Sequence, residues 1–382
     1  MSLPRLLTAL VVLVLGCGPK PVPQESPLDT PENHYRRGQA LLEQNDLVGA
    51  EREFGRVRDL EPDHPGARVG AALVAALQGD FHRARQEVAA AVHQNRDYAD
   101  AYLALGRVVT LEAAAREYPP QDWLAEAKSA FTKAAEQAPS EPSVPFYLGQ
   151  ACLQAFELDQ ARAAFTRAIE ANQSPWTERA MSRLETLQQA ERAAPGTRVG
   201  MRLALLPKLN RAELAVLLVE ELKLPELVRQ RRGPEPVPGF VPPGGDKGAM
   251  PSLIEAKDLA GCWAAPWVRA ALELGVPGLE VYPDSTFRPE LPLTRADQAL
   301  VLQGLLVLLT GDPGLATRYL DETSRFADVR GDYYAYNAIA VSTERGVMAA
   351  DQRGYFRPQD PVSGAEALLA VRQLQNAFRM EF

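Results

Sequence analysis

The stretch YPDSTFRPELPLTRAD, residues 282–297, joins a loop to the start of a helix. Its Pro-Asp-Ser segment favours a tight turn, and Asp284 is expected to close that turn by accepting hydrogen bonds from backbone N–H groups. Thr294 and Asp297 have the spacing of a capping box, in which each side chain bonds the backbone N–H of the other residue. A capping box requires nothing of the residue that follows its first member. The presence of Arg295 at this position therefore indicates that the segment does more than start a helix.

The same design occurs in two further places. Residues 356–366, FRPQDPVSGAE, repeat the end of the loop and put Ser363 and Glu366 at the capping positions. Upstream, Asn210 and Glu213 form another helix start, which is followed by leucines on one helical face. Three helix starts of one design predict three structural copies in the C-terminal half of the chain.

Arginine follows the cap residue in two of the copies, as Arg211 and Arg295, and Gly364 replaces it in the last copy. On the first turn of a helix, an arginine lies near free N–H groups and the positive end of the helix dipole, where a carboxylate is favoured. Trp267 and Tyr334 each precede an alanine by four residues on the helix before the loop. Each ring is interpreted either as part of the core or as a platform for a sugar ring.

These motifs resemble the S-layer homology domain, whose signature combines a Trp-Ala helix, a Tyr-Pro-Asp-Gly-Thr-Phe-Arg-Pro loop and a Thr-Arg-Ala-Glu helix start. The resemblance implies a helical, pseudo-threefold module whose grooves bind a cell-wall polysaccharide or a peptidoglycan-linked polymer. It implies that Arg211 and Arg295 face this polymer, and it suggests Trp267 and Tyr334 as further contacts. The module is expected over residues 198–382, with a partial copy at 198–224 that lacks its leading helix and loop, a Pro/Gly-rich linker at 225–250, and copies at 251–310 and 320–382.

Upstream of this module, small residues recur at intervals of 34 residues. Gly38 and Ala72 mark two such copies, and Gly106 and Gly149 mark two more, with a nine-residue insertion near Tyr118. The small residues let two helices cross closely, and an aromatic residue at a later fixed position fills the space between copies. The spacing and the residue types resemble the tetratricopeptide repeat, a helix-turn-helix unit.

Four such repeats and a closing amphipathic helix near Trp176 to Arg192 predict a helical solenoid over residues 31–192. One repeat cannot bury its apolar face alone, so the copies are expected to stack. The resemblance implies a protein partner, of unknown identity, on the concave face. The fold class expected for the whole chain is mainly α, with the solenoid followed by the pseudo-threefold module.

Residues 1–16 have the features of an export signal, with Arg5 ahead of an apolar run that is too short to cross a membrane. The run ends in VLGC at 14–17, which resembles the lipobox of bacterial lipoproteins. The resemblance implies a mature chain that begins at a lipid-modified Cys17, with acyl chains such as palmitate that hold it on a membrane. A Pro-rich linker is expected at 17–30. An ordinary signal peptide with a chance cysteine is the alternative.

The composition argues against several classes of function. Lys+Arg 41 against Asp+Glu 49 gives a net charge of -8, which has the wrong sign for a protein whose main partner is nucleic acid. The 3 cysteines and 4 histidines include no CxxC pair and no metal-ligand spacing, so neither a metal nor another cofactor is expected. No metalloprotease, nucleophile-elbow or phosphate-loop motif occurs, and no catalytic residue is predicted.

The leading hypothesis is a non-catalytic lipoprotein of the cell envelope that binds cell-wall polymer through one module and a protein through the other. Because Gly18 is not the aspartate that favours retention in an inner membrane, the lipoprotein resemblance favours the outer membrane. The alternative is an envelope assembly factor or co-chaperone scaffold whose C-terminal module is only structural. An enzyme that acts on the cell wall is a third hypothesis.

Overall fold

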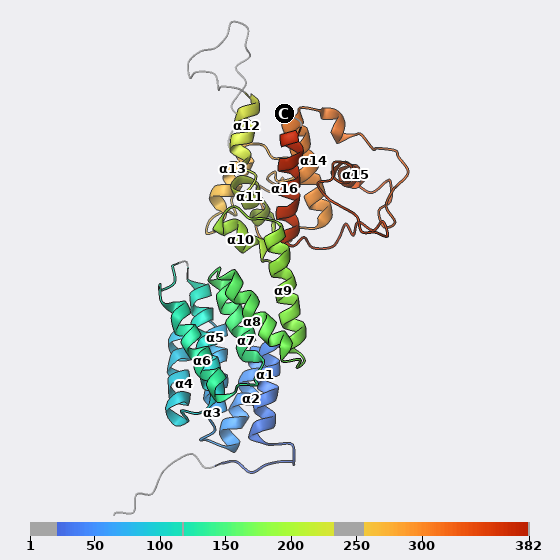
Figure 1. Cartoon of the computed structure of the whole chain (residues 1–382). Coiled ribbons are helices and arrows are strands. Elements are labelled where there is room, and N and C mark those ends of the chain that lie inside the picture. The colour runs from blue at the N-terminus through green and yellow to red at the C-terminus, as the bar shows by residue number, and fades with distance from the viewer. Residues whose placement is uncertain (1–20, 117, 233–255, 381–382) are drawn as a thin grey trace, which may run out of the picture. The chain divides into compact units, whose positions relative to one another are not determined.

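The computed structural model describes residues 21–116, 118–232 and 256–380 (Figure 1). All named elements in these ranges are helices, and two isolated β-bridges accompany them. The chain divides into two compact units, Met1–Leu184 and Glu185–Phe382. The mainly α fold expected from the sequence is confirmed.

In the part of the chain that the structure describes, the first unit contains four helix pairs (Figure 1). The two helices of each pair pack against each other, and each pair packs against the next. The helices are α1 (Pro31–Glu43), α2 (Leu47–Leu60), α3 (Pro65–Leu77), α4 (Phe81–Gln94), α5 (Ala99–Ala115), α6 (Trp123–Gln137), α7 (Ser143–Gln154) and α8 (Leu158–Glu170).

Local sequence signals start several of these helices. Asp46 and Asp80 each accept a hydrogen bond from the backbone N–H three residues ahead, at 2.9 and 3.0 Å, which satisfies a donor that the helix itself leaves free. Pro31 and Pro65 are the first residues of their helices, where a missing N–H costs nothing. The starts of these four helices are thus encoded within a few residues.

Glycines on the first helix of a pair lie against phenylalanine rings on the second. A Cβ atom built on these glycines would stand only 2.5 to 2.6 Å from the ring, closer than real Cβ atoms approach. The contacts are Gly38 with Phe54, Gly106 with Phe131 and Gly149 with Phe165. The close helix crossing that the sequence pattern predicts is confirmed, and it explains why these positions have no side chain.

The predicted insertion lies within the third pair. Helix α5 has 17 residues, against 13 in α1, and a loop follows it before α6 begins at Trp123. Tyr118 in this loop is 83% exposed. The extra residues lengthen one helix and its loop, and the two helices of the pair still pack together.

Helix α9 (Trp176–Arg192) is the closing helix that the sequence predicts. The Trp176 ring packs on Phe146 and Tyr147 of α7, at centroid distances of 5.3 and 5.5 Å. The boundary between the two units falls within this helix, after Leu184.

The second unit is built from helices around its own apolar core. They are α10 (Arg198–Ala204), α11 (Arg211–Glu220), α12 (Leu224–Arg232), α13 (Ala265–Glu273), α14 (Arg295–Thr310), the 3-10 turn η1 (Pro313–Ala316), α15 (Tyr336–Glu344) and α16 (Gly364–Met380).

Two expectations for this unit differ from the structure. The first copy has a leading helix after all, because α10 precedes α11, although it is only seven residues long. Helix α12 lies where the linker at 225–250 was expected to begin, and residues 233–255 are outside the described part of the chain.

The three copies of the second unit form a closed ring. Helix α11 packs on α13, α14 on α15, and α16 on α10. The backbone N–H of Leu209 donates to the carbonyl of Val362 at 2.9 Å, that of Val362 to Leu293 at 3.1 Å, and that of Leu293 to Leu209 at 2.9 Å. All three residues are buried, and each directly precedes a helix-capping residue. This cycle of hydrogen bonds gives the unit its pseudo-threefold arrangement.

Candidate functional site

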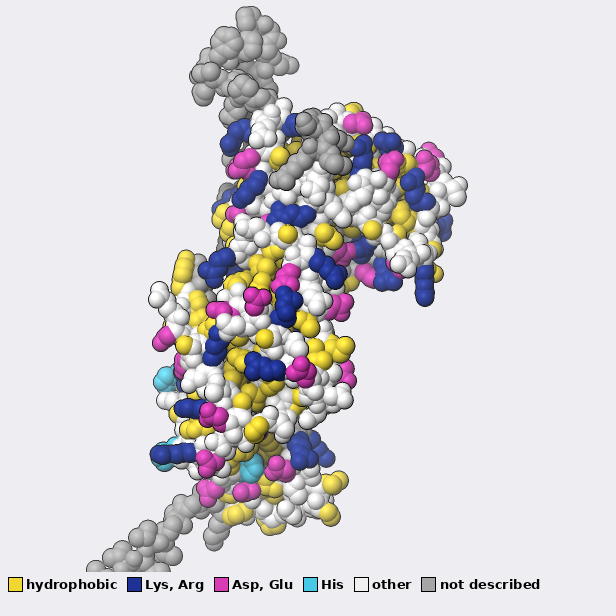
Figure 2. All heavy atoms as spheres, viewed as in Figure 1, with side chains coloured by type: hydrophobic (Ala, Val, Ile, Leu, Met, Phe, Trp, Pro, Cys, Tyr) yellow, Lys and Arg dark blue, Asp and Glu magenta, His cyan; other side chains and the backbone are white. Residues whose placement is uncertain are grey.

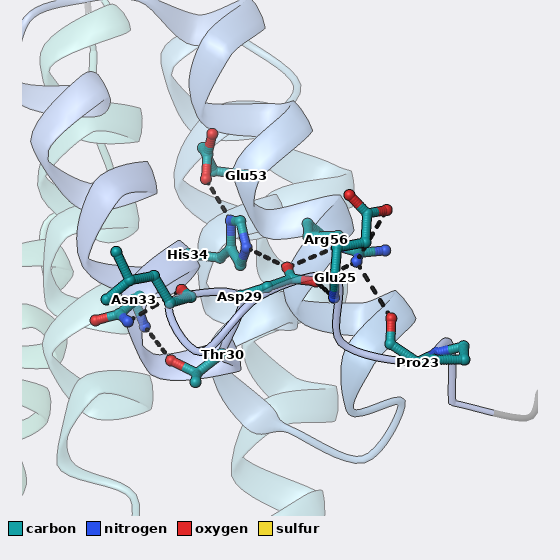
Figure 3. A network of polar contacts seen from close by, with 9 residues as sticks. Pro23, Glu25, Asp29, Thr30, Asn33, His34, Glu53 and Arg56 are labelled. Carbon is teal, nitrogen blue, oxygen red and sulfur yellow. Dashed lines mark hydrogen bonds and ion pairs between the residues drawn. The ribbon is translucent and has the colours of Figure 1, made fainter.

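The predicted lipid anchor Cys17 lies outside the described residues, so its modification stays a prediction. The described end of the Pro-rich segment packs against the first two helices (Figure 3). Asp29 is buried and accepts a hydrogen bond from Arg56 Nε at 3.0 Å, which keeps the pKa of Asp29 well below its usual value. The His34 ring contacts Asp29 at 2.8 Å and Glu53 at 2.6 Å. The end of this segment is therefore fixed to the first helix pair.

Reciprocal hydrogen bonds start two helices of the second unit. Asn210 accepts from the Glu213 backbone N–H at 2.9 Å, and the Glu213 carboxylate accepts from that of Asn210 at 2.8 Å. Thr294 and Asp297 exchange the same two bonds, at 3.2 and 3.0 Å. These pairs hold the arginine that follows each cap residue on the first turn of its helix.

Arg211 is directed at the backbone of the second copy and is 9% exposed. Its Nε, Nη1 and Nη2 atoms donate to the carbonyls of Phe287, Gly278 and Glu280, at 3.1, 2.9 and 3.1 Å. Burial lowers the pKa of the guanidinium. In this geometry Arg211 fixes the loop of the neighbouring copy, and its contact with a polymer stays a prediction.

Arg295 does the same for the third copy. Its Nε and Nη2 atoms donate to the carbonyls of Phe356 and Ala349, at 2.7 and 2.8 Å. Its guanidinium also forms an ion pair with the carboxylate of Glu366 on α16. Ser363 still accepts a hydrogen bond from the Glu366 backbone N–H at 3.2 Å. The Glu366 carboxylate thus pairs with an arginine of the second copy and not with the backbone of its own cap residue.

Gly364 takes the place of an arginine because the first copy has no loop to hold. A Cβ atom at Gly364 would overlap the carbonyl oxygen of Leu203, at the end of α10. The Gly364 N–H donates to the carbonyl of Leu206 at 2.9 Å. The short connection between α10 and α11 therefore lies directly against the start of α16.

Two aspartates that the sequence analysis did not select also fix the loops. Asp258 accepts from the backbone N–H of Phe287 at 2.8 Å, and Asp328 from that of Phe356 at 2.8 Å, and each also accepts from the next residue. The sequence signal is an aspartate before an aliphatic residue ahead of each loop. Asp284 accepts from the N–H two residues ahead at 3.0 Å, as the sequence predicts.

Two tryptophans form a partly exposed pair where the first copy meets the second. Trp263 is 42% exposed, and its ring lies 5.8 Å from that of Trp267 on α13. Trp267 Nε1 donates to the Glu220 carboxylate on α11 at 2.7 Å. The guanidinium of Arg202 on α10 lies 4.9 Å from the centre of the Trp263 ring. We call these four residues the tryptophan platform.

Tyr334 holds the corresponding place where the second copy meets the third. It is 66% exposed, and its ring lies 4.6 Å from that of Tyr333. Ala264 and Ala335 occupy the cap positions before α13 and α15, and Trp263 and Tyr334 directly precede them. Tyr334 is thus the structural equivalent of Trp263. The sequence spacing instead suggests Trp267, one helical turn further on, as its equivalent.

The third junction has no such ring. Thr197 caps α10, and the residue before it is Gly196. The junction of the third copy with the first therefore has glycine both at the ring position and at the arginine position, Gly364. Two junctions thus have both an aromatic ring and an arginine at these positions, and the third has glycine at both.

In the first unit, the first helices of the pairs are joined by their own side chains. The Glu43 carboxylate on α1 pairs with Arg107 of α5 at 3.5 Å and with Arg179 of α9 at 2.6 Å, and Tyr147 of α7 donates to it. The Arg107 guanidinium lies 4.1 Å from the centre of the Tyr147 ring. Side-chain contacts within the unit thus join α1, α5, α7 and α9 around Glu43.

Other kinds of site were sought among the described residues. In the ranges 21–116, 118–232 and 256–380, no three His, Cys, Asp or Glu side chains are grouped so as to hold a metal ion. Within the same ranges, no helix combines the length and the apolar character needed to cross a membrane. Cys152 is buried, and burial raises the pKa of its thiol.

The sequence matches two protein families. Residues 41–108 and 121–175 match the tetratricopeptide repeat, and residues 257–299 and 325–368 match the S-layer homology domain. The first unit contains tetratricopeptide repeats and the second contains S-layer homology domains. Both kinds of domain are non-catalytic, and together they imply binding to a cell-wall polymer and to protein, in association with the cell envelope.

Solved structures resemble parts of the chain at low identity. One is the crystal structure of a thermophilic TPR protein of Thermus thermophilus, at 20% identity and a TM-score of 0.37, covering 52% of this chain and 96% of that one. Another is yeast Tom70, at 14% identity and a TM-score of 0.24, covering 43% of this chain and 41% of that one. A search of curated proteins finds no match.

Proposed function

We propose that this protein is a non-catalytic component of the cell envelope that binds a cell-wall polymer with its second unit and a protein partner with its first. The observation that carries the proposal is the tryptophan platform. Its partly exposed aromatic pair lies in a matched S-layer homology domain, beside the Glu220 carboxylate and the Arg202 guanidinium. Sugar rings have apolar C–H faces that pack on aromatic rings, and their hydroxyls bond carboxylates and guanidinium groups.

The proposed polymer site includes the rings of Trp263, Trp267 and Tyr334 and the two arginines, Arg211 and Arg295. The arginines hold the loops of the second and third copies, so they support the site even where their own donors are used. A contact between the polymer and their remaining N–H groups is part of the proposal.

Cosedimentation with purified cell-wall sacculi tests the polymer site. The double variant Trp263→Ala plus Trp267→Ala is expected to bind at least about tenfold more weakly, because it removes the stacking surface. Tyr118→Ala removes an exposed ring from the first unit and is the control. Unchanged binding by the double variant, with its helix content retained, would show that the polymer binds elsewhere.

The proposed location is the cell envelope, with a lipid on Cys17 that anchors the protein, in the outer membrane. Cys17→Ser is expected to release the protein from the membrane fraction, because no acyl chain remains. A Cys152→Ser variant is the control, since that thiol is buried in the first unit. Retention of the Cys17→Ser protein in membranes would contradict lipidation at this residue.

A second candidate is an assembly factor or co-chaperone scaffold whose S-layer homology domains serve as structure. The use of Arg211 and Arg295 on backbone carbonyls favours it, because those contacts stabilise the ring without a ligand. Failure of the wild-type protein to sediment with sacculi would favour this candidate.

A further inference from the structure

The first unit contains a groove between α2, α3 and α4. It has a volume of about 340 Å³, and residues that line it include Gly55 and Arg58 of α2, Ala71 of α3 and Arg83 of α4. We call it the α2–α4 groove. Its volume is at the lower end of the range found for sites that hold a small ligand or a few side chains.

Small residues create the apolar floor of this groove. A Cβ atom at Gly55 would meet no other atom within 4 Å, so the space above this residue is open. Ala71 extends the floor along α3, and the edge of the Phe54 ring contributes to it. The Phe54 ring is itself buried against Gly38 and Gly70, so the floor is rigid.

The rim of the groove carries an excess of positive charge. Arg68 is paired with Glu87 at 3.2 Å. Arg58 and Arg83 are exposed, and neither forms an ion pair with a residue in the described part of the chain. Glu51 is the remaining acidic group of the lining, so two unpaired guanidinium groups face one carboxylate.

Elsewhere in the unit, many charged side chains lie beside side chains of opposite charge (Figure 2). Arg107 of α5 and Arg179 of α9 are both engaged by Glu43. At the groove, by contrast, guanidinium groups with unused donors lie beside an open apolar floor.

We propose that the α2–α4 groove binds an extended acidic segment of a protein partner. An apolar side chain of the segment packs over Gly55 and Ala71, and its carboxylates pair with Arg58 and Arg83. The inference rests on one part of the proposed function, namely that the first unit binds a protein. It places that partner between α2, α3 and α4 and not around Glu43.

Fluorescence anisotropy with a labelled short peptide that alternates Asp and Leu tests the inference in the full chain. Arg58→Glu plus Arg83→Glu is expected to weaken binding by about tenfold or more, since both charge-assisted contacts become repulsive. Gly55→Leu is expected to weaken it similarly by filling the floor. The matched control is Arg36→Glu plus Arg52→Glu, which makes the same charge change at exposed residues outside the lining and is expected to bind normally.

A peptide that alternates Asn and Leu is expected to bind far more weakly than the acidic probe. Equal binding of the two peptides, normal binding by Gly55→Leu, or no binding of the acidic probe to the wild-type chain would each overturn the proposal. All variants are expected to sediment with sacculi as the wild type does. The peptide assay therefore tests the groove, and the sacculus assay tests the polymer site independently of it.

Discussion

Arg211 links two copies of the second unit through three hydrogen bonds to backbone carbonyls. Arg211→Ala is expected to lower the free energy of unfolding of this unit by about 3 kcal/mol, because buried carbonyls lose a charged donor. Urea unfolding followed by circular dichroism measures the change. Arg288→Ala is the control, since Arg288 is half exposed and its ion pair with Asp284 contributes at most about 1 kcal/mol. A cost below that of the control would show that the three bonds do not stabilise the ring.

Gln298 is fully buried on α14, and in the described residues neither its amide oxygen nor its amide nitrogen has a hydrogen-bond partner. Leu214 occupies the same place after the cap in the first copy, and Ala367 in the third. Gln298→Leu is therefore expected to raise the free energy of unfolding by about 1 to 3 kcal/mol, because an unsatisfied amide is removed. Gln303→Leu on the same helix is the contrast: it removes a 2.8 Å bond to the Leu315 carbonyl and is expected to destabilise. Thermal unfolding distinguishes the two signs.

Glu221 ties the start of α10 to α16. Burial raises its pKa, but hydrogen bonds from Thr197 and Gly196 and the ion pair with Arg372 outweigh this effect and bring the pKa below the ordinary 4.5. A carboxylate with a lowered pKa adds stability that is present above its unfolded-state pKa and is lost as the pH falls through the folded-state value. The free energy of unfolding of the second unit is therefore expected to decrease below about pH 4.5.

Urea titrations at pH 7 and at lower pH check this dependence. Glu221→Gln is expected to be less stable at pH 7 and to show a flatter pH profile, since it cannot ionise. A variant with the same profile as the wild type would assign the acid sensitivity to other groups.

At the scale of elements, helix positions were predictable where the signal is local. The capping pairs Asn210 with Glu213 and Thr294 with Asp297 join residues three positions apart, and the first unit repeats one pattern of glycines and phenylalanines. Helix α10 was missed because it has seven residues and no ring to mark its start. Its presence depends on packing against α16, which the sequence does not reveal.

The candidate site was only partly predictable for the same reason. The arginines and tryptophans could be selected by residue type, but the partners of Arg211 lie more than sixty residues along the chain. The sequence spacing aligns Tyr334 with Trp267 because each precedes an alanine by four residues. The glycines that end the two helices, Gly275 and Gly346, instead align Tyr334 with Trp263. The role of Asp258 depends on a contact across 29 residues, which its local signal, an aspartate before an aliphatic residue, does not reveal.

A comparison of two helical glycines tests the packing of the first unit. Gly106→Ala is expected to destabilise the unit by about 1 to 3 kcal/mol, because its new Cβ atom would lie 2.5 Å from the Phe131 ring. Gly55→Ala is expected to stabilise it by about 0.5 to 1 kcal/mol, since nothing lies within 4 Å and alanine favours a helix. Unfolding midpoints of the two variants that shift in the same direction would contradict this account.

At the scale of the whole molecule, the two units differ in how their parts depend on one another. Each helix pair of the first unit packs mainly on its neighbours, whereas the second unit is closed by contacts between its first and last helices. A chain that ends after Val362 lacks α16 and is expected to lose the folded structure of the entire second unit. Limited proteolysis, with the first unit as the protected internal control, measures this loss. Protection of residues 198–362 in the shortened chain would show that the ring is not required.

The cycle of hydrogen bonds through Leu209, Leu293 and Val362 also has a consequence for biosynthesis. Because Val362 is the last of these residues along the chain, the ribosome must synthesise the second unit as far as the start of α16 before the cycle can close. The helix pairs of the first unit can fold one after another as they emerge. Nascent chains are thus expected to present a folded first unit and an open second unit until α16 has emerged from the ribosome.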